Sequence, residues 1–177
     1  MRVITIQDIG VYKTLLKYGR YTVSELAPVP VNLIKPYEFM KKHYKYYHRP
    51  IFLCPVGYHV NFGGAKTEHA HIIELEIPDR FCKIQDYYGW SDFIYFTELP
   101  WEYQPFNGNK TVEQFGRYVL DMYKDGPKQN DCVYQVTTQF LLKSWIKDIK
   151  NVDRNFINKY YDTGGDKVLE SIIGTHR

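Results

Sequence analysis

The sequence predicts an α+β fold in a single globular domain spanning residues 1–177, with short mixed or antiparallel sheets around a central cleft and helices on the flanks. The chain has 177 residues, of which 44% are hydrophobic. This length is sufficient for one domain with a substantial core and is short for two domains of ordinary size. Short strand-like runs are interspersed with helical apolar spacings along the chain. Two of these runs carry polar residues where a purely structural strand would be apolar, which predicts strands that border a cleft.

The chain opens with a strand and a helix. Residues 3–7, Val-Ile-Thr-Ile-Gln, predict a strand in which Thr5 and Gln7 share one face. Asp8 is placed to cap a helix, and Gly19 is placed to end it in a left-handed conformation. The apolar residues of this helix fall on one side, at Ile9, Tyr12, Leu15 and Leu16.

A second helix is rich in tyrosine. Pro36 suits its first turn, and the helix is expected to run through Tyr47. Its apolar stripe consists of Tyr37, Met40, Tyr44 and Tyr47. Pro50 ends the helix, residues 51–54 predict a short strand, and residues 56–67 predict a mobile glycine-containing loop.

The middle of the chain alternates strands and helices. Residues 71–77 predict a strand with Ile73, Leu75 and Ile77 inside and with Glu74 and Glu76 on a wet side. Residues 81–84 are a further strand candidate.

Two helices follow. Asp86 is placed to cap the first, which carries Trp90, Phe93 and Ile94 and is broken at Leu99-Pro100. Thr111 and Gln114 predict a capping box for the second. The apolar residues of that second helix are Val112, Phe115, Val119 and Met122.

The C-terminal part contains the second polar-centred strand. After a turn at residues 125–127, residues 132–138 predict a strand with Gln135 and Thr137 on one face. An apolar pattern follows at Leu141, Leu142, Trp145, Ile146 and Ile149. A closing amphipathic helix is expected around Val168, Leu169, Ile172 and Ile173.

Composition bounds the classes of function. The net charge of +3 neither demands nor excludes a nucleic-acid partner.

The three cysteines, Cys54, Cys82 and Cys132, lack the Cys-x-x-Cys spacing of zinc or redox sites and indicate reduced thiols. No signal peptide or membrane span is expected, which favours a cytoplasmic protein without membrane contact. Seventeen tyrosines and ten phenylalanines suggest that some rings face a ligand or partner.

The opening strand, helix and glycine, together with a late strand followed by the apolar pattern of Leu142, Trp145, Ile146 and Ile149, resemble the ADP-ribosyltransferase fold. In that fold, NAD lies across a groove between two small sheets. The resemblance implies that Thr5 and Gln7 hold the nucleotide, on the strand that usually carries a His or Arg. It places Gln135 where the family often has an acidic residue. Tyr21 or Tyr47 would then stack on the nicotinamide.

Gln135 departs from the family pattern in a way that bears on catalysis. An amide can hydrogen-bond ribose hydroxyls but does not take a proton at neutral pH, so a mono-ADP-ribosyltransferase-like reaction needs another group, such as Glu98 or Asp131. The alternative is that Thr5, Gln7 and Gln135 are buried polar residues that satisfy neighbouring backbone groups.

A second resemblance covers nearly the whole chain. The ordered motifs Thr5-Ile6-Gln7, Tyr37-Glu38-Phe39-Met40, Pro50-Ile51-Phe52, Glu74-Leu75-Glu76-Ile77-Pro78-Asp79, Trp90 before Leu99-Pro100, and Gln135 through Trp145 are similar to an uncharacterised family of bacterial and phage proteins. This resemblance implies a bacterial or phage origin and carries no activity with it.

The tyrosine-rich helix is also strongly basic. Lys41, Lys42 and Lys45 with Tyr44 combine cations that reach phosphates with rings that stack on bases. The helix therefore supports a second hypothesis, a non-catalytic phage or mobile-element protein that binds and inhibits a host defence protein or binds a nucleic acid. The structural alternative is an amphipathic helix with a solvated lysine face.

A metal site is the weakest hypothesis. His69 and His71 are spaced by two and would share one strand face, but a working site needs at least a third protein ligand. No bound metal is therefore expected.

Overall fold

Six of the described strands form one antiparallel sheet, in the order β5-β6-β3-β1-β4-β8. The structure is a computed structural model, which describes residues 1–56, 69–98, 111–126 and 134–153. The strand bounds are β1 Arg2–Asp8, β3 Ile51–Pro55, β4 His69–Glu76, β5 Lys83–Asp86, β6 Tyr134–Thr138 and β8 Ile146–Asp153. Two short strands, β2 (Arg20–Tyr21) and β7 (Leu141–Leu142), pair with each other.

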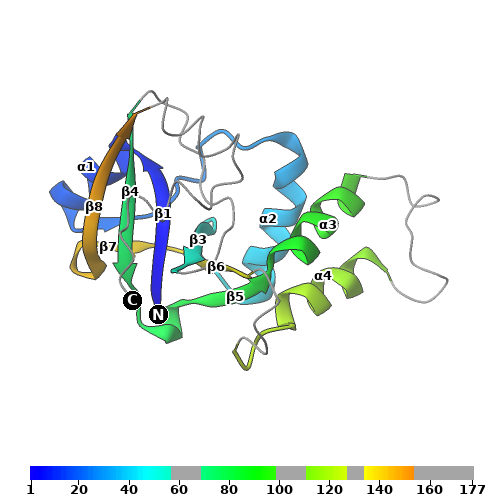
Figure 1. Cartoon of the computed structure of the whole chain (residues 1–177). Helices are drawn as coiled ribbons and strands as arrows, with labels where there is room; N and C mark the ends of the chain where they lie inside the picture. Colours follow the sequence, from blue (N-terminus) through cyan, green and yellow to red (C-terminus); the bar gives the residue numbers. More distant parts are fainter. Residues whose placement is uncertain (57–68, 99–110, 127–133, 154–177) are drawn as a thin grey trace.

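The sheet turns sharply between its two halves. In Figure 1, β1, β4 and β8 stand upright, whereas β5 and β6 run across the view. β3 belongs to both halves because it pairs with β1 on one side and with β6 on the other. The first strand of the chain therefore lies next to the strand that joins the two groups.

The helices lie on different sides of this sheet. Their bounds are α1 Ile9–Tyr18, α2 Val31–Tyr44, α3 Tyr87–Glu98 and α4 Val112–Asp121. Figure 1 shows α2, α3 and α4 grouped at the β5–β6 end and α1 beside β8 and β4. Short 3-10 turns at Asp79–Phe81 and Lys143–Trp145 connect β4 to β5 and β7 to β8. None of the described helices combines the length and the apolar character needed to span a bilayer.

Two apolar cores result from this arrangement. One packs α1 against the sheet through Leu15, Leu53, Ile73 and Val136, among others. The other is made by α2, α3 and α4 and consists of Met40, Trp90, Phe93, Val119 and Leu120. The described residues thus form the mixed helix-and-strand architecture that the sequence predicts.

Several local predictions are confirmed. The first strand and helix form, and Gly19 ends α1 with a φ of 73°. Asp86 caps α3 because its Oδ1 accepts a hydrogen bond from the Gly89 backbone at 2.6 Å. The capping box of Thr111 and Gln114 is complete. Asp8 occupies the N-cap position of α1, but its side chain makes no capping hydrogen bond there.

The prediction for the second helix is wrong at both ends. α2 begins at Val31, so Pro36 lies inside the helix and not in its first turn. It ends at Tyr44 because Lys45 adopts a left-handed conformation with φ 56°. Tyr47 therefore lies beyond the helix.

The prediction that Glu74 faces solvent, on the polar side of residues 71–77, is wrong. β4 lies between β1 and β8, and Glu74 is only 8% exposed. Its carboxylate accepts a hydrogen bond from Nε of Arg2 on β1. Glu76 is exposed and pairs with Lys147 on β8 at 2.6 Å. β4 can carry two acids within the sheet because each is paired with a cation of a neighbouring strand, Glu74 with Arg2 on β1 and Glu76 with Lys147 on β8. The strand expected at residues 81–84 also shifts, because residues 79–81 form a turn before β5.

Other expectations lie outside the described residues: the loop at 57–67, the break at Leu99-Pro100, the end of the turn at Pro127, the start of the strand at Cys132, and the helix around residues 168–173.

Two helical glycines give a matched pair of substitutions. A Cβ at Gly116 would lie 2.5 Å from Phe93 Cε2 and 2.7 Å from Phe39 Cε1, whereas a Cβ at Gly10 would meet nothing within 4 Å. We expect Gly116→Ala to lower the free energy of unfolding by about 1–2 kcal/mol, because overpacking outweighs the better helix propensity of alanine. We expect Gly10→Ala to raise it by about 0.5 kcal/mol. Urea denaturation of both variants tests whether the two substitutions change the free energy of unfolding in opposite directions. Equal changes would contradict the close packing of α3 and α4.

Candidate functional site

A cavity of about 480 Å³ lies where β1, β3 and β6 approach α2 and α3. We call it the glutamine cavity, because Gln7 at the end of β1 and Gln135 in β6 both line it. The rest of its lining is mostly apolar and aromatic: Val23, Ala27, Pro28, Val29, Pro30, Leu33, Tyr37, Arg49, Pro50, Ile51, Phe52, Tyr87, Trp90, Ser91 and Ile94. Two amides set among rings are suited to a planar polar ligand.

Aromatic rings form the wall on the helical side. Trp90 is buried, and its ring centroid lies 6.1 Å from that of Phe52, which in turn lies 5.6 Å from Tyr37. Burial raises the pKa of Tyr37, although nearby Arg49 acts in the opposite direction. Burial also raises the pKa of Tyr87. Both phenols therefore stay protonated at neutral pH and can donate hydrogen bonds.

Gln135 provides the least satisfied polar group of this cavity. The residue is 5% exposed, and its Nε2 has no hydrogen-bond partner among the described residues. A buried donor without a partner costs about 1–3 kcal/mol, so a ligand acceptor at this point would be favoured. Gln135 stands directly opposite Gln85 on β5, whose Oε1 is also without a partner in the described part of the chain.

Gln7 is oriented by its neighbour on the same strand face. Its Nε2 donates to Oγ1 of Thr5 at 2.8 Å, and Thr5 in turn donates to the Phe52 backbone oxygen at 3.1 Å. Thr5 is fully buried, so it supports Gln7 and does not line the cavity. Thr5 therefore fits the alternative prediction, in which the polar strand residues are buried and form hydrogen bonds with neighbouring backbone groups.

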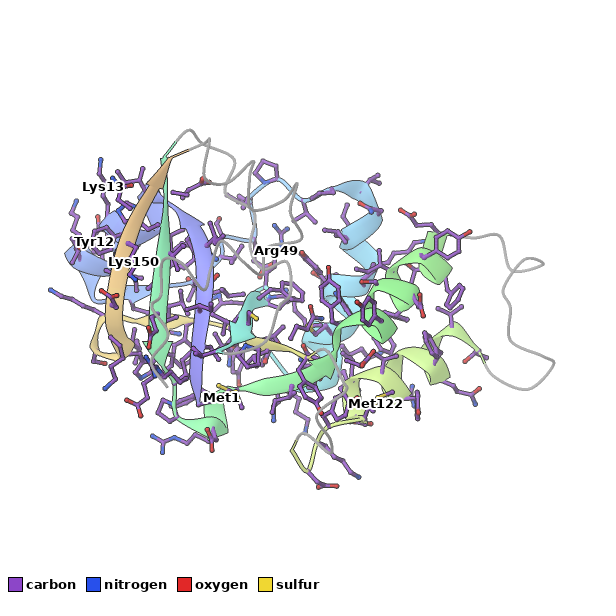
Figure 2. The ribbon with its side chains drawn as sticks, viewed as in Figure 1. Met1, Tyr12, Lys13, Arg49, Met122 and Lys150 are labelled. Atoms are coloured by element: carbon purple, nitrogen blue, oxygen red, sulfur yellow. The ribbon has the colours of Figure 1, made fainter. Side chains whose placement is uncertain are left out.

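Arg49 fixes one rim of the cavity. Its guanidinium donates to the backbone oxygens of Ala27 at 2.6 Å and Glu25 at 2.6 Å, and to that of Ser24 at 3.3 Å. Nε also lies 3.5 Å from the Glu25 carboxylate. Figure 2 shows Arg49 between the sheet and α2. Since its donors are occupied by this segment, Arg49 positions the wall of the cavity.

The other predicted nucleotide-site residues lie elsewhere. Tyr21 is in β2, where it packs against the core of α1. Tyr47 is 85% exposed and lines a shallow groove beside Lys41, Lys42 and Lys45. Glu98 ends α3 and lines a separate hollow beside Lys35. The structure thus brings Gln7 and Gln135 together, without Tyr21, Tyr47 or Glu98. Asp131 lies outside the described residues.

The basic residues of the α2 region have different roles. Lys41 is held by Glu25 at 3.1 Å and by Glu38 at 3.5 Å. Lys42 and Lys45 are exposed. Tyr44 is largely buried, and its hydroxyl donates to the Leu120 backbone oxygen at 2.8 Å. Tyr44 therefore joins α2 to α4, and only Lys42 and Lys45 are open for a partner among these predicted contact residues.

A polar network joins β5 and β6 to the C-terminal end of α2. Gln85 Nε2 donates to Oγ1 of Thr137 at 2.8 Å and to the hydroxyl of Tyr44 at 3.1 Å. The Tyr46 hydroxyl donates to the Thr137 backbone oxygen at 3.1 Å. Burial raises the pKa of both tyrosines, and the hydrogen bonds from Gln85 and to Thr137 only partly oppose it. Thr137, predicted at the cleft, instead holds this network together.

The described histidine and cysteine candidates include His71 and Cys82. Within the described residues, no group of three or more His, Cys, Asp or Glu is placed to hold a metal ion. His71 is buried against the ring of Tyr12 at 4.8 Å, and burial lowers its pKa. Burial raises the pKa of the Cys82 thiol to about 11, so this thiol is protonated at neutral pH.

Sequence reasoning did not single out Tyr87 and Trp90 as cavity residues, nor Arg49 as the residue that fixes the rim. The high aromatic content was a signal, but it does not tell which rings converge. Comparison of the chain with family models, with curated proteins and with solved structures gives no match. The site must therefore be interpreted from its own chemistry.

Proposed function

We propose that this protein is a NAD-binding domain of the ADP-ribosyltransferase-like kind and that the glutamine cavity holds the ring-bearing part of the nucleotide. The observation that carries the proposal is that Gln135 lines this cavity and that its buried Nε2 has no hydrogen-bond partner among the described residues. A nicotinamide carboxamide or an adenine edge offers acceptor atoms to such a donor. The volume of about 480 Å³ lies within the range of small-molecule sites.

The position of the cavity supports the same proposal. It borders β1, β3 and β6, where the upright and crosswise halves of the sheet meet. The resemblance implies a groove between two small sheets for NAD, and this cavity lies beside the junction of the two halves of one continuous sheet. Tyr37, Tyr87 and Trp90 supply aromatic surface, in place of the Tyr21 and Tyr47 expected from the sequence.

The proposal concerns binding, because the charges around the cavity limit the chemistry. None of the described lining residues is a carboxylate, and the lining cation, Arg49, already binds backbone oxygens. The glutamine amides do not act as general bases at neutral pH. Glu98, predicted as the acidic partner, lines a different hollow. The proposal therefore covers binding of NAD and does not extend to the transfer of ADP-ribose.

The test is a thermal-shift titration with NAD, ADP-ribose and nicotinamide as separate ligands. At a concentration of about one hundred times Kd, a ligand that binds only the folded state stabilises it by about 2.7 kcal/mol, which raises the Tm by roughly 5–10 °C for a chain of this size. Comparison of nicotinamide with ADP-ribose tells which half of NAD occupies the cavity. Absence of a saturable shift with all three ligands would overturn the proposal.

Gln135→Met gives the sharpest variant. It keeps the length of the side chain and removes the unpartnered donor, so we expect the NAD shift to disappear while the free energy of unfolding stays equal or rises by up to about 1 kcal/mol. The control is Gln139→Met, which removes an amide outside the cavity whose Oε1 accepts from the Tyr47 backbone at 2.9 Å. This control should keep the full NAD shift. A loss of stability in Gln135→Met would mean that Gln135 and Gln85 bind each other, and that the donor is structural.

A further inference from the structure

A second concave site lies away from the glutamine cavity. It has a volume of about 560 Å³ and is formed by the ends of α2 and α4 and by β5. We call it the lysine cleft, because its lining includes four exposed cations, Lys45, Arg80, Lys83 and Lys124. These four residues come from three parts of the chain, with Arg80 and Lys83 close together, so the fold and not a single local charge run brings them together.

The positive charge of the lysine cleft is not neutralised by its own acids. Among the described residues, none of the four cations forms an ion pair. The two lining carboxylates contact other groups of the lining, because Asp121 contacts His43 at 2.9 Å and Asp79 accepts from the Met1 amino group at 2.9 Å. A concave surface with several unpaired cations attracts a ligand that carries several negative charges.

Lys45 joins this cleft to a second basic surface. It also lines the shallow groove that contains Lys42 and Tyr47. Its left-handed backbone, with φ 56°, is unfavourable for a residue with a side chain and would suit glycine better. Beside it, the ring of Tyr47 is 85% exposed. The combined surface thus offers several cations and one exposed aromatic ring.

We propose that the lysine cleft and the adjoining Tyr47 bind single-stranded nucleic acid. Lys45, Lys83, Arg80 and Lys124 contact successive phosphates, and Tyr47 stacks on an unpaired base. An exposed ring favours a single strand because the bases of a duplex are already stacked on each other. This inference does not depend on NAD binding, since the two sites have no lining residue in common.

The test measures fluorescence anisotropy of labelled oligouridylate and oligothymidylate of about 15 nucleotides, with a duplex of equal length and inorganic polyphosphate as parallel probes. Lys45→Glu with Lys83→Glu should weaken single-strand binding at least about tenfold and reduce the slope of log K against log salt by about two. The matched control is Lys13→Glu with Lys17→Glu, which changes net charge equally on exposed positions of α1. In Figure 2, Lys13 lies on the opposite side of the molecule from Met122, which follows α4.

Two further variants separate stacking and folding effects from charge. Tyr47→Ala should weaken single-strand binding about tenfold and leave polyphosphate binding unchanged. Lys45→Gly should raise the Tm by about 2 °C while it weakens single-strand binding, which excludes misfolding as the cause. Equal losses in the α1 control, equal affinity for the duplex, or no effect of Tyr47→Ala would each overturn the proposal.

Discussion

Phe93→Ala lowers the free energy of unfolding by about 3–5 kcal/mol, the expected cost of removing a large buried ring. Phe93 is 1% exposed at the centre of the helical core, with ring centroids 5.0 Å from Phe39 on α2 and 5.6 Å from Trp90 on α3. The same ring closes the contact with Gly116 on α4. One side chain therefore joins three helices. Urea denaturation followed by circular dichroism measures the loss.

Tyr95→Ala is the control for this prediction, because Tyr95 is on the same helix and 57% exposed. We expect it to change the free energy of unfolding by less than about 1 kcal/mol. In the Phe93→Ala background, Gly116→Ala should cost less than it does alone, because the nearest clashing atom is gone. A loss below about 1 kcal/mol for Phe93→Ala would show that the three helices pack independently of this ring.

The stability of the protein falls as the pH rises above about 10, the ordinary pKa of tyrosine. Burial raises the pKa of Tyr44 and of Tyr46 in the folded state. Above pH 10 the unfolded chain releases these two protons while the folded chain retains them, so the free energy of unfolding decreases with pH. Below pH 10 both states keep the protons, and the two groups add no pH dependence. Each group contributes about 1.4 kcal/mol per pH unit, or roughly 3 kcal/mol for both at pH 11.

Urea denaturation between pH 8 and pH 11 at constant ionic strength tests this slope. The Tyr44→Phe and Tyr46→Phe double variant loses stability at pH 8, because both hydroxyls donate to backbone oxygens, but its slope above pH 10 is smaller. Tyr18→Phe with Tyr95→Phe removes two exposed hydroxyls and should leave the slope unchanged. A double variant with the full original slope would show that other groups cause the alkaline loss.

Three predictions that depend only on neighbouring residues hold. The caps at Asp86 and Thr111 and the left-handed Gly19 each involve residues within four positions, so their interactions do not depend on the rest of the fold. The start of α2 could not be predicted in this way. Arg49, which follows that helix, binds the backbone just before it, and a sequence pattern does not show such a return contact.

The C-terminal segment shows how pairing overrides apolar spacing. Leu142, Trp145, Ile146 and Ile149 are spaced as on one side of a helix. Leu142 ends β7, Trp145 lies in the 3-10 turn, and Ile146 and Ile149 belong to β8, because β4 offers a long antiparallel edge on which Ile149 pairs with Ile73. That edge is available only because β4 pairs with β1 on its other side, and such a long-range pairing cannot be predicted from a local sequence pattern.

The candidate site was predictable in part for the same reason. Gln7 and Gln135 line the cavity, whereas Thr5 and Thr137, which were predicted on the same strand faces, do not. Their convergence requires the order β6-β3-β1, which depends on the whole sheet. The rings that complete the cavity come from α2 and α3, and the aromatic content of the sequence does not select Tyr37 and Trp90 from the others.

The strand order also governs how the chain can mature on the ribosome. β6 and β8 are close in sequence, yet β6 pairs with β3 in one half of the sheet and β8 pairs with β4 in the other. Until both have emerged, β3 and β4 each keep an open edge, and β5 has no neighbour because it pairs with β6. Open strand edges are templates for aggregation. Both halves of the sheet therefore stay open until residues 134–153 have been synthesised, and they then close almost together.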